Sequence, residues 1–496
     1  MFKWLRRRRL PQEIYCDRQV QTLPDSHAIL FGRGAAVVPT VQELPSSQLG
    51  PISEPLQDIP AADVDDISGA VRLEDHAAAP PPEKVVLGPP DDVRFRTPTG
   101  LEKTVLEFDR ALIIGSCFSH IFCLYLPHVF HKVQVDHIVY NHAGTLPEAP
   151  QHPVKAYDLQ IIMLPLRTAM PEQLYFRLGY NDLAGHEAAF QDAKERLIQM
   201  LQGALKYRET KQIATFVANF AVPQQNPVGR LLPRYDLRNP VYFIEMLNRV
   251  VADEIADLAN VHLLDVDGIS ANFGRKYVQD DLVSIINRGS ILADWEQEFD
   301  TGRLEALAPL STLHYSRVGE FIVAICHEMH AMVRTLRQTD QVKIVIVDLD
   351  DTLWRGVVAE EGIHRPLLTE GWPVGFAEAL AFLKKRGVLL AIVSKNDEAR
   401  IRELWPSIYG SRLELSDFAS IRINWEPKAD NVAKVLEEVN LLPRSAVFID
   451  DNPVERENVK SAFPDIRVLG ASPYEFRRAL LWASETQVAT VTEESG

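Results

Sequence analysis

Residues 342–354 read VKIVIVDLDDTLW, and this stretch decides the fold of the second half of the chain. Its first six residues form an almost wholly apolar run, which predicts a strand buried on both faces, as in a parallel sheet. Asp348, Asp350 and Asp351 follow directly. Because chemistry in open parallel sheets lies at the carboxyl ends of the strands, this strand end is the first candidate site.

Three carboxylates so close together repel one another. At about 4 Å and an effective dielectric near 20, each pair costs about 4 kcal/mol. A divalent cation would compensate for this repulsion, and all-oxygen ligands favour Mg²⁺. Asp348 and Asp350 lie two residues apart, so on a strand they face the same side. One of them can therefore attack a substrate while the other moves a proton.

A second expected strand, over residues 388–393, also ends in polar side chains. Ser394 follows it directly and can donate a hydrogen bond to a phosphoryl oxygen. Asn396 or Asp397 then caps the next helix, which is the ordinary role of these residue types.

Two further strand ends complete the set. Lys428 lies in the first turn of an expected helix, where a cation opposes the helix dipole and is favoured only if it faces an anion. Asp450 and Asp451 follow the expected strand over residues 446–449, and we expect them to be metal ligands. A DxDxT motif, a serine, a lysine and an aspartate pair, each at a strand end, predict a site for phosphoryl transfer.

The segments DLDDTLW, SKND, INWEPKADN and FIDDNPVEREN resemble the haloacid dehalogenase (HAD) superfamily, and more narrowly its subfamily IIIC, the FkbH-like proteins. The resemblance covers about residues 340–470. It implies that Asp348 is the nucleophile of a phosphatase, forming an aspartyl-phosphate, and that Asp350 is the general acid and base. It also implies phosphoryl binding by Thr352, Ser394 and Lys428.

The same resemblance implies a metal site and a substrate class. Mg²⁺ would bind Asp348, the carbonyl of Asp350 and Asp450, with Asp451 as a further candidate ligand. The substrate would be a small phosphorylated metabolite, because FkbH-like proteins dephosphorylate 1,3-bisphosphoglycerate and place a glyceryl unit on an acyl carrier protein. This chain departs from the usual pattern at Arg355, which adds charge beside the site, and it has no cysteine directly before Ser394.

The spacing of the motifs leaves no room for a large cap domain. A helix and a strand fill most of the chain between Thr352 and Ser394, and only about residues 354–362 remain as a flap. An open site of this kind suits a bulky or protein-bound substrate, or a lid supplied by the first half of the chain.

The first α/β half, residues 101–338, carries a weaker signal. Gly115 and Ser116 follow an apolar strand and precede a helix, which resembles the first block of SGNH-type hydrolases, with Ser116 at the nucleophile position. That family places an aspartate three residues before a C-terminal histidine, yet Ser311 precedes His314 here. The alternatives are a plain structural turn, or Cys117 as an acyl-carrying thiol. Asn219 is a further candidate oxyanion donor.

Composition sets the remaining limits. The chain has 496 residues, and its 52 Lys+Arg and 68 Asp+Glu give a net charge of −16, which argues against general nucleic-acid binding. Four cysteines without a CxxC pair do not form a disulfide scaffold, so a reducing, cytoplasmic location is expected. No apolar stretch predicts a secretory signal or a membrane span.

The sequence therefore predicts two Rossmann-like parallel-sheet domains after a disordered leader. The expected parts are a Pro- and Asp-rich leader over residues 1–95, an SGNH- or flavodoxin-like α/β domain over 101–338, a capless HAD-like domain over 341–485 and a polar tail over 486–496. Two other functions stay open: an esterase or O-acyltransferase using the first domain, and a non-catalytic ligand-binding scaffold. The oligomeric state is not predicted.

Overall fold

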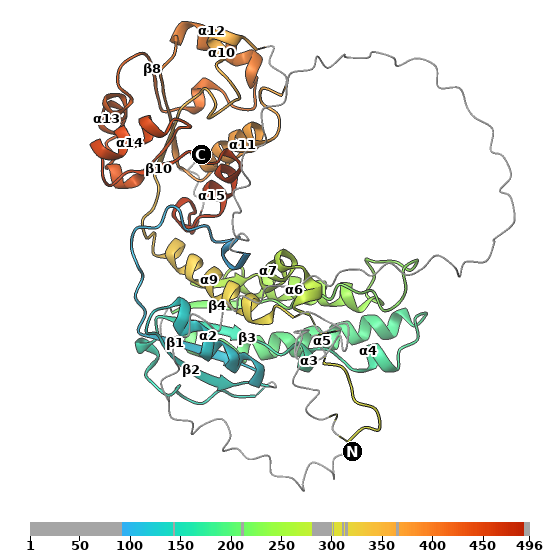
Figure 1. The fold of residues 1–496 in the computed structure, drawn as a ribbon. Coiled ribbons are helices and arrows are strands. Elements are labelled where there is room, and N and C mark those ends of the chain that lie inside the picture. Colours follow the sequence, from blue (N-terminus) through green and yellow to red (C-terminus); the bar gives the residue numbers. More distant parts are fainter. Residues whose placement is uncertain are drawn as a thin grey trace, which may run out of the picture. The chain divides into compact units, whose positions relative to one another are not determined.

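The computed structural model describes residues 92–490 apart from 142–143, 210–212, 280–299, 301, 310–311, 313–315 and 364–366. Most of the expected leader, His314 and Ser311 therefore lie outside the described residues. The described chain forms two parallel five-stranded sheets with helices between the strands, as the alternating sequence pattern predicts (Figure 1). Within these residues, no helix is both long and apolar enough to cross a membrane.

The first sheet has the strand order β2-β1-β3-β4-β5, the doubly wound order of flavodoxin-like folds. Its strands are β1 (Arg110–Gly115), β2 (Gln134–Val139), β3 (Leu159–Met163), β4 (Ala214–Ala218) and β5 (Val261–Leu264). Its α-helices are α2 (Phe122–Val129), α3 (Leu166–Ala169), α4 (Gln173–Phe176), α5 (Leu183–Ala204), α6 (Pro240–Ile255), α7 (Val266–Phe273) and α9 (Val318–Leu336). The short 3₁₀ helix η2 (Cys117–Ile121) leads from β1 into α2.

The two faces of this sheet bury separate cores. Leu112 and Ile114 of β1 belong to the core beneath α5 and α6, whereas Ala111 and Ile113 belong to the core beneath α2 and α9. The alternation follows from the period of two along a strand. Burial on both faces explains why β1 reads as a continuous apolar run in the sequence.

The edge strand β2 was not expected from the sequence. Its side chains are mostly half-buried, and it contains Asp136 and His137 in the run QVDHIV. Asp136 accepts hydrogen bonds from Tyr157 (2.7 Å) and His152 (2.8 Å), so the polar residue is satisfied by tertiary partners. The pairing of β2 with β1 thus depends on contacts that no local apolar pattern indicates.

The second sheet has the order β10-β9-β6-β7-β8 and is also wholly parallel. Its strands are β6 (Ile344–Val347), β7 (Leu389–Ser394), β8 (Ser420–Ile423), β9 (Ala446–Ile449) and β10 (Arg467–Leu469). Its α-helices are α10 (Val358–Glu361), α11 (Trp372–Lys385), α12 (Glu398–Ile408), α13 (Lys428–Glu438), α14 (Pro453–Ala462) and α15 (Phe476–Trp482). The central strand β6 lies between β9 and β7, so the strand order reverses direction at the β6–β9 pair.

Both ends of the described region differ from the sequence-based expectation. The carbonyls of Arg94 and Phe95 accept hydrogen bonds from Arg478, so order begins before residue 96. Glu485 and Thr486 are buried, so packed residues extend into the expected polar tail, which begins at residue 486. Glu485 is buried because its carboxylate pairs with Arg334 of α9, a contact between residues far apart in the sequence.

Candidate active site

Asp348 begins the site at the carboxyl end of β6. Its backbone N–H donates to the carbonyl of Ile449 at 2.9 Å, which continues the β6–β9 ladder by one residue. The ladder places Asp348 beside the end of β9, where Asp450 follows. This is the point at which the strand order reverses, and ligand sites in open α/β sheets form at such points.

Lys428 lies between the two buried carboxylates. At the start of α13, its Nζ is 3.0 Å from Asp348 Oδ2 and 2.6 Å from Asp450 Oδ2. Burial acts to lower the pKa of Lys428, but the adjacent charges of Asp348 and Asp450 outweigh it and the pKa is raised. The ammonium is therefore held charged. The sequence-based expectation that this lysine faces an anion is consistent with these contacts.

Three carboxylates at this strand edge could share a metal ion. Ligand oxygens of Asp348, Asp450 and Asp451 all lie within 4.8 Å of one another. Burial, followed by the nearby Asp348 charge, raises the pKa of Asp450 to about 6. Closely spaced oxygen donors fit a hard divalent cation. The carboxylate of Asp350 is not in this group.

Asp350 instead points toward β7 and the segment before α10. Its Oδ1 accepts hydrogen bonds from Trp354 Nε1 (2.8 Å) and the backbone N–H of Val358 (3.1 Å), and its Oδ2 accepts one from Asn396 Nδ2 (2.7 Å). Burial raises the pKa of Asp350, although the hydrogen bonds from Trp354 and Val358 act to lower it. A carboxyl with a raised pKa, close to the expected nucleophile in sequence, is suited to carrying a proton.

The hydroxyl-bearing residues lie at the same edge. The Oγ1 of Thr352 accepts a hydrogen bond from the backbone N–H of Asp451 at 3.0 Å, which ties the turn after β6 to the turn after β9. Ser394 is buried at the end of β7, and its carbonyl accepts from the backbone N–H of Asn424. The structure thus places all seven predicted residues at the carboxyl edge of one sheet, while their chemical roles stay predictions.

The structure decides between two capping alternatives near the site and shows the contacts of Arg355. Asp397, and not Asn396, caps α12 through a hydrogen bond from the backbone N–H of Arg400, which leaves the Asn396 amide to reach Asp350. The guanidinium of Arg355 donates to the carbonyls of Leu367 and Glu370. Arg355 therefore holds this loop through two backbone carbonyls.

The turn after β9 needs two residues that the motifs did not indicate. Arg456 Nη1 donates to the backbone carbonyls of Asp450 (2.7 Å) and Asp451 (2.6 Å). Gly470 has a φ of +152°, and a Cβ there would lie 1.8 Å from the carbonyl oxygen of Asp450. Glycine is required at this position because the two backbones approach so closely. Neither role has a local sequence signal.

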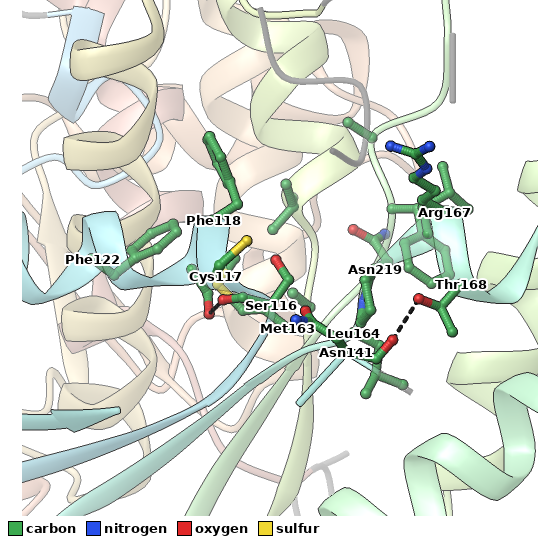
Figure 2. A pocket seen from close by; sticks show the side chains of 17 residues that line it. Ser116, Cys117, Phe118, Phe122, Asn141, Met163, Leu164, Arg167, Thr168 and Asn219 are labelled. Carbon is green, nitrogen blue, oxygen red and sulfur yellow. Dashed lines mark hydrogen bonds between the residues drawn. The ribbon is translucent and has the colours of Figure 1, made fainter. Parts of the chain in front are cut away.

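A separate cavity of about 330 Å³ lies at the carboxyl ends of β1, β3 and β4. Ser116 and Cys117 lie on one side of it, and Arg167 and Thr168 lie on the other (Figure 2). Much of the remaining lining is apolar, including Phe118. The first sheet thus has a hollow beside the Gly115–Ser116 turn.

Several polar groups around this cavity are occupied by structural contacts. Asn219 Nδ2 donates to Asp265 at 2.9 Å, and its Oδ1 accepts from the backbone N–H of Asp267, so its amide ties two loops together. The hydroxyl of Ser119 contacts the Ser116 carbonyl and His137 Nε2. These bonds hold the turn in place. The side chain of Ser116 forms no capping hydrogen bond to η2.

The cysteines differ in accessibility. Cys117 is exposed, Cys123 is half-buried and Cys326 is buried. Burial raises the pKa of Cys123 to about 11 and raises that of Cys326 still further, so both thiols stay protonated. Cys117 is therefore the accessible thiol among the described cysteines.

Comparisons with known proteins place the fold. No family model matches the sequence, and no curated protein matches it. A 3-deoxy-D-manno-octulosonate 8-phosphate phosphatase from Moraxella catarrhalis, solved with magnesium, phosphate and the sugar, aligns with 32% of this chain and 93% of its own at 15% identity and a TM-score of 0.22.

A more extensive match is the N-terminal part of the protein BF1531 from Bacteroides fragilis, which contains a phosphatase domain and was solved in complex with Mg. The TM-score is 0.53 at 20% identity, over 81% of this chain and 99% of that chain. The aligned part of this chain is longer than either sheet with its helices, so the match extends over both sheets. The chain therefore has the two-sheet fold of a protein that contains a phosphatase domain.

Proposed function

We propose that the chain is a Mg²⁺-dependent phosphatase of the HAD type that removes phosphate from a small phosphorylated metabolite. The observation that carries the proposal is the cluster at the β6–β9 edge, where Asp348, Asp450 and Asp451 can share one cation and Lys428 bridges two of them. The Bacteroides protein of similar fold was solved with Mg. The Mg in that protein and the oxygen ligands available here together support Mg²⁺ as the metal.

The reaction follows from the roles proposed for two carboxylates. An oxygen of Asp348 attacks phosphorus, a bond forms between them, and the bond from phosphorus to the leaving oxygen breaks. Asp350 gives its proton to that oxygen and then takes a proton from the water that attacks phosphorus. The bond from phosphorus to the Asp348 oxygen breaks, so inorganic phosphate leaves and the Asp348 carboxylate is restored. Lys428, Ser394 and Thr352 would hold the phosphoryl oxygens. Mg²⁺ would supply positive charge that offsets the charge on these oxygens.

The metal requirement gives the first test. We expect that excess chelator stops hydrolysis of a small phosphate ester, that added Mg²⁺ restores it, and that Ca²⁺ restores little. Ca²⁺ prefers more ligands and a looser geometry, which would misplace the attacking carboxylate. The measurement is phosphate release with each metal after chelation. Full turnover in excess chelator would remove the metal from the proposal.

The narrower FkbH-like assignment is part of the proposal. It adds transfer of a glyceryl or acyl group onto an acyl carrier protein, and it is supported by the motif resemblance and by the short β6–β7 connection. Its described residues form only α10 and α11 between the two strands. A site without an inserted cap leaves room for a protein-bound substrate. The thiol for such a transfer would be Cys117, because it is the exposed cysteine among those described.

The cavity beside Ser116 favours a second candidate function, that of an esterase or O-acyltransferase. Three variants separate the possibilities: Ser116→Ala, Cys117→Ala and His314→Ala. We expect Cys117→Ala to lose transfer of a labelled acyl group to carrier protein while it keeps Asp348-dependent phosphate release. Loss of ester hydrolysis in both Ser116→Ala and His314→Ala would favour the esterase instead. Wild-type behaviour of all three would reject both chemistries for this cavity, leaving a non-catalytic ligand-binding or docking role.

A further inference from the structure

We propose that Trp354 and Asn396 are positioning residues that fix the orientation of the Asp350 carboxyl group. In this orientation Oδ2 of Asp350 carries the proton that passes to the leaving alcohol of a phosphate monoester. The inference rests on the proposed phosphatase function of the same site. It adds two residues whose roles the motifs do not assign, and it names the class of substrate for which they are needed.

The hydrogen bonds to Asp350 distinguish its two oxygens. A carboxylate oxygen has two lone pairs directed in the carboxylate plane. Oδ1 accepts from both Trp354 Nε1 (2.8 Å) and the Val358 N–H (3.1 Å), so both of its positions are used. Oδ2 accepts only from Asn396 Nδ2 (2.7 Å) among the described residues, so one position stays open. The proton that passes to and from the substrate therefore belongs on Oδ2.

The Trp354 donor is held rigidly. Trp354 is completely buried, and its ring lies edge-on to Trp405 with centroids 5.7 Å apart at 74°. Tyr409 packs against both rings, and its hydroxyl donates to the carbonyl of Leu353, the residue before Trp354, at 2.5 Å. The indole N–H cannot follow Asp350 if that carboxylate rotates, so rotation would cost a buried hydrogen bond.

The Asn396 donor is oriented from its other side. The Oδ1 of Asn396 accepts a hydrogen bond from the backbone N–H of Asp397 at 3.0 Å, which directs Nδ2 toward Asp350. Asn396 is itself buried. Two donors on different elements, one on each oxygen, thus fix the plane of the Asp350 carboxylate before any substrate binds. Such preorganisation is what a positioned proton donor requires.

The substrate class follows from what a proton donor accomplishes. An alkoxide is a poor leaving group, so the Asp350 proton must reach the leaving oxygen as its bond to phosphorus breaks and the bond from Asp348 forms. Positioned proton transfer contributes about 10²- to 10⁴-fold to such steps. An aryl phosphate releases a stable phenolate and needs little help. The arrangement around Asp350 therefore serves phosphate monoesters of ordinary alcohols.

The test compares two leaving groups in the full-length protein with Mg²⁺. The variants are Trp354→Phe and Asn396→Ala, and the substrates are an alkyl phosphate and p-nitrophenyl phosphate. The quantity compared is kcat/KM, because it reports the phosphorylation step. In both variants we expect kcat/KM to fall about tenfold or more with the alkyl phosphate and less than about threefold with the aryl phosphate. Trapped aspartyl-phosphate from p-nitrophenyl phosphate should rise, because activation of water also uses Asp350.

Trp405→Phe is the matched control. It removes an indole N–H from the same aromatic cluster, but that N–H bonds the carbonyl of Leu413 and not Asp350. We expect Trp405→Phe to affect both substrates equally at a comparable melting temperature. If Trp354→Phe and Asn396→Ala lowered kcat/KM equally for both substrates, this inference would be overturned, but the proposed phosphatase function would stand. Absence of Asp348-dependent turnover in the unmodified chain would overturn the proposed function, and this inference with it.

Discussion

Replacing Asp348 by asparagine is expected to reduce phosphatase turnover by about 10³-fold or more without unfolding the chain. The amide has nearly the shape of the carboxylate, but its oxygen is a poor nucleophile and cannot form a normal aspartyl-phosphate. The fold should tolerate the change because Lys428 keeps its 2.6 Å contact with Asp450. The measurement is phosphate release together with thermal unfolding.

The matched control is Asp430→Asn, which removes one charge from an exposed position in the first turn of α13, the helix that carries Lys428. We expect that variant to retain nearly full turnover. If Asp348→Asn kept most of the activity, the nucleophile assignment would be wrong. If both variants lost activity to the same extent, the effect would reflect the charge of the region and not a bond formed by Asp348.

The largest effect on stability is expected at Arg334. Its guanidinium is buried in α9 and contacts Glu485 (2.9 Å) and Asp340 (2.8 Å), and it donates to the carbonyl of Thr104 (2.6 Å). Arg334→Met would leave the fully buried Glu485 carboxylate without its cation. Breaking a buried ion pair from one side costs about 3–5 kcal/mol. The measurement is the shift of the urea unfolding midpoint.

Arg337→Met serves as the control, three residues further along the chain. Arg337 is 41% exposed and its contact with Asp158 is 3.4 Å long, so its loss should cost about 1 kcal/mol or less. The double variant Arg334→Met with Glu485→Met should recover part of the stability, because it removes the uncompensated charge. Equal effects of Arg334→Met and Arg337→Met would show that the buried pair does not stabilise the fold.

The sequence predicted the elements that carry a strong local pattern. The run at residues 342–347 is apolar because β6 is buried on both faces, and the expected strand over residues 446–449 coincides with β9. Residues that directly follow such strands, such as Asp348 and Asp450, could be assigned to one edge because parallel strands end on the same side of a sheet. Local pattern and strand direction were sufficient for this part of the site.

Elements with mixed polarity were missed. The edge strand β2 carries Asp136 within its sequence, and β10 has only three residues. A short or half-polar strand has no period long enough to distinguish it from a loop. Its pairing depends on a neighbour that is distant in the chain, so only the folded structure shows it.

By itself, the sequence determined the two parallel-sheet units and the residue types at their strand ends, because buried strands require continuous apolar runs and clustered carboxylates require a partner of opposite charge. Only the tertiary structure decided which partner each of those side chains contacts. Asn396 could cap a helix or reach Asp350, and Lys428 could pair with any nearby anion. The burial of Glu485 also depended on Arg334, a residue of another element. Each outcome depends on distances between segments far apart in the chain, and local propensity carries no information about those distances.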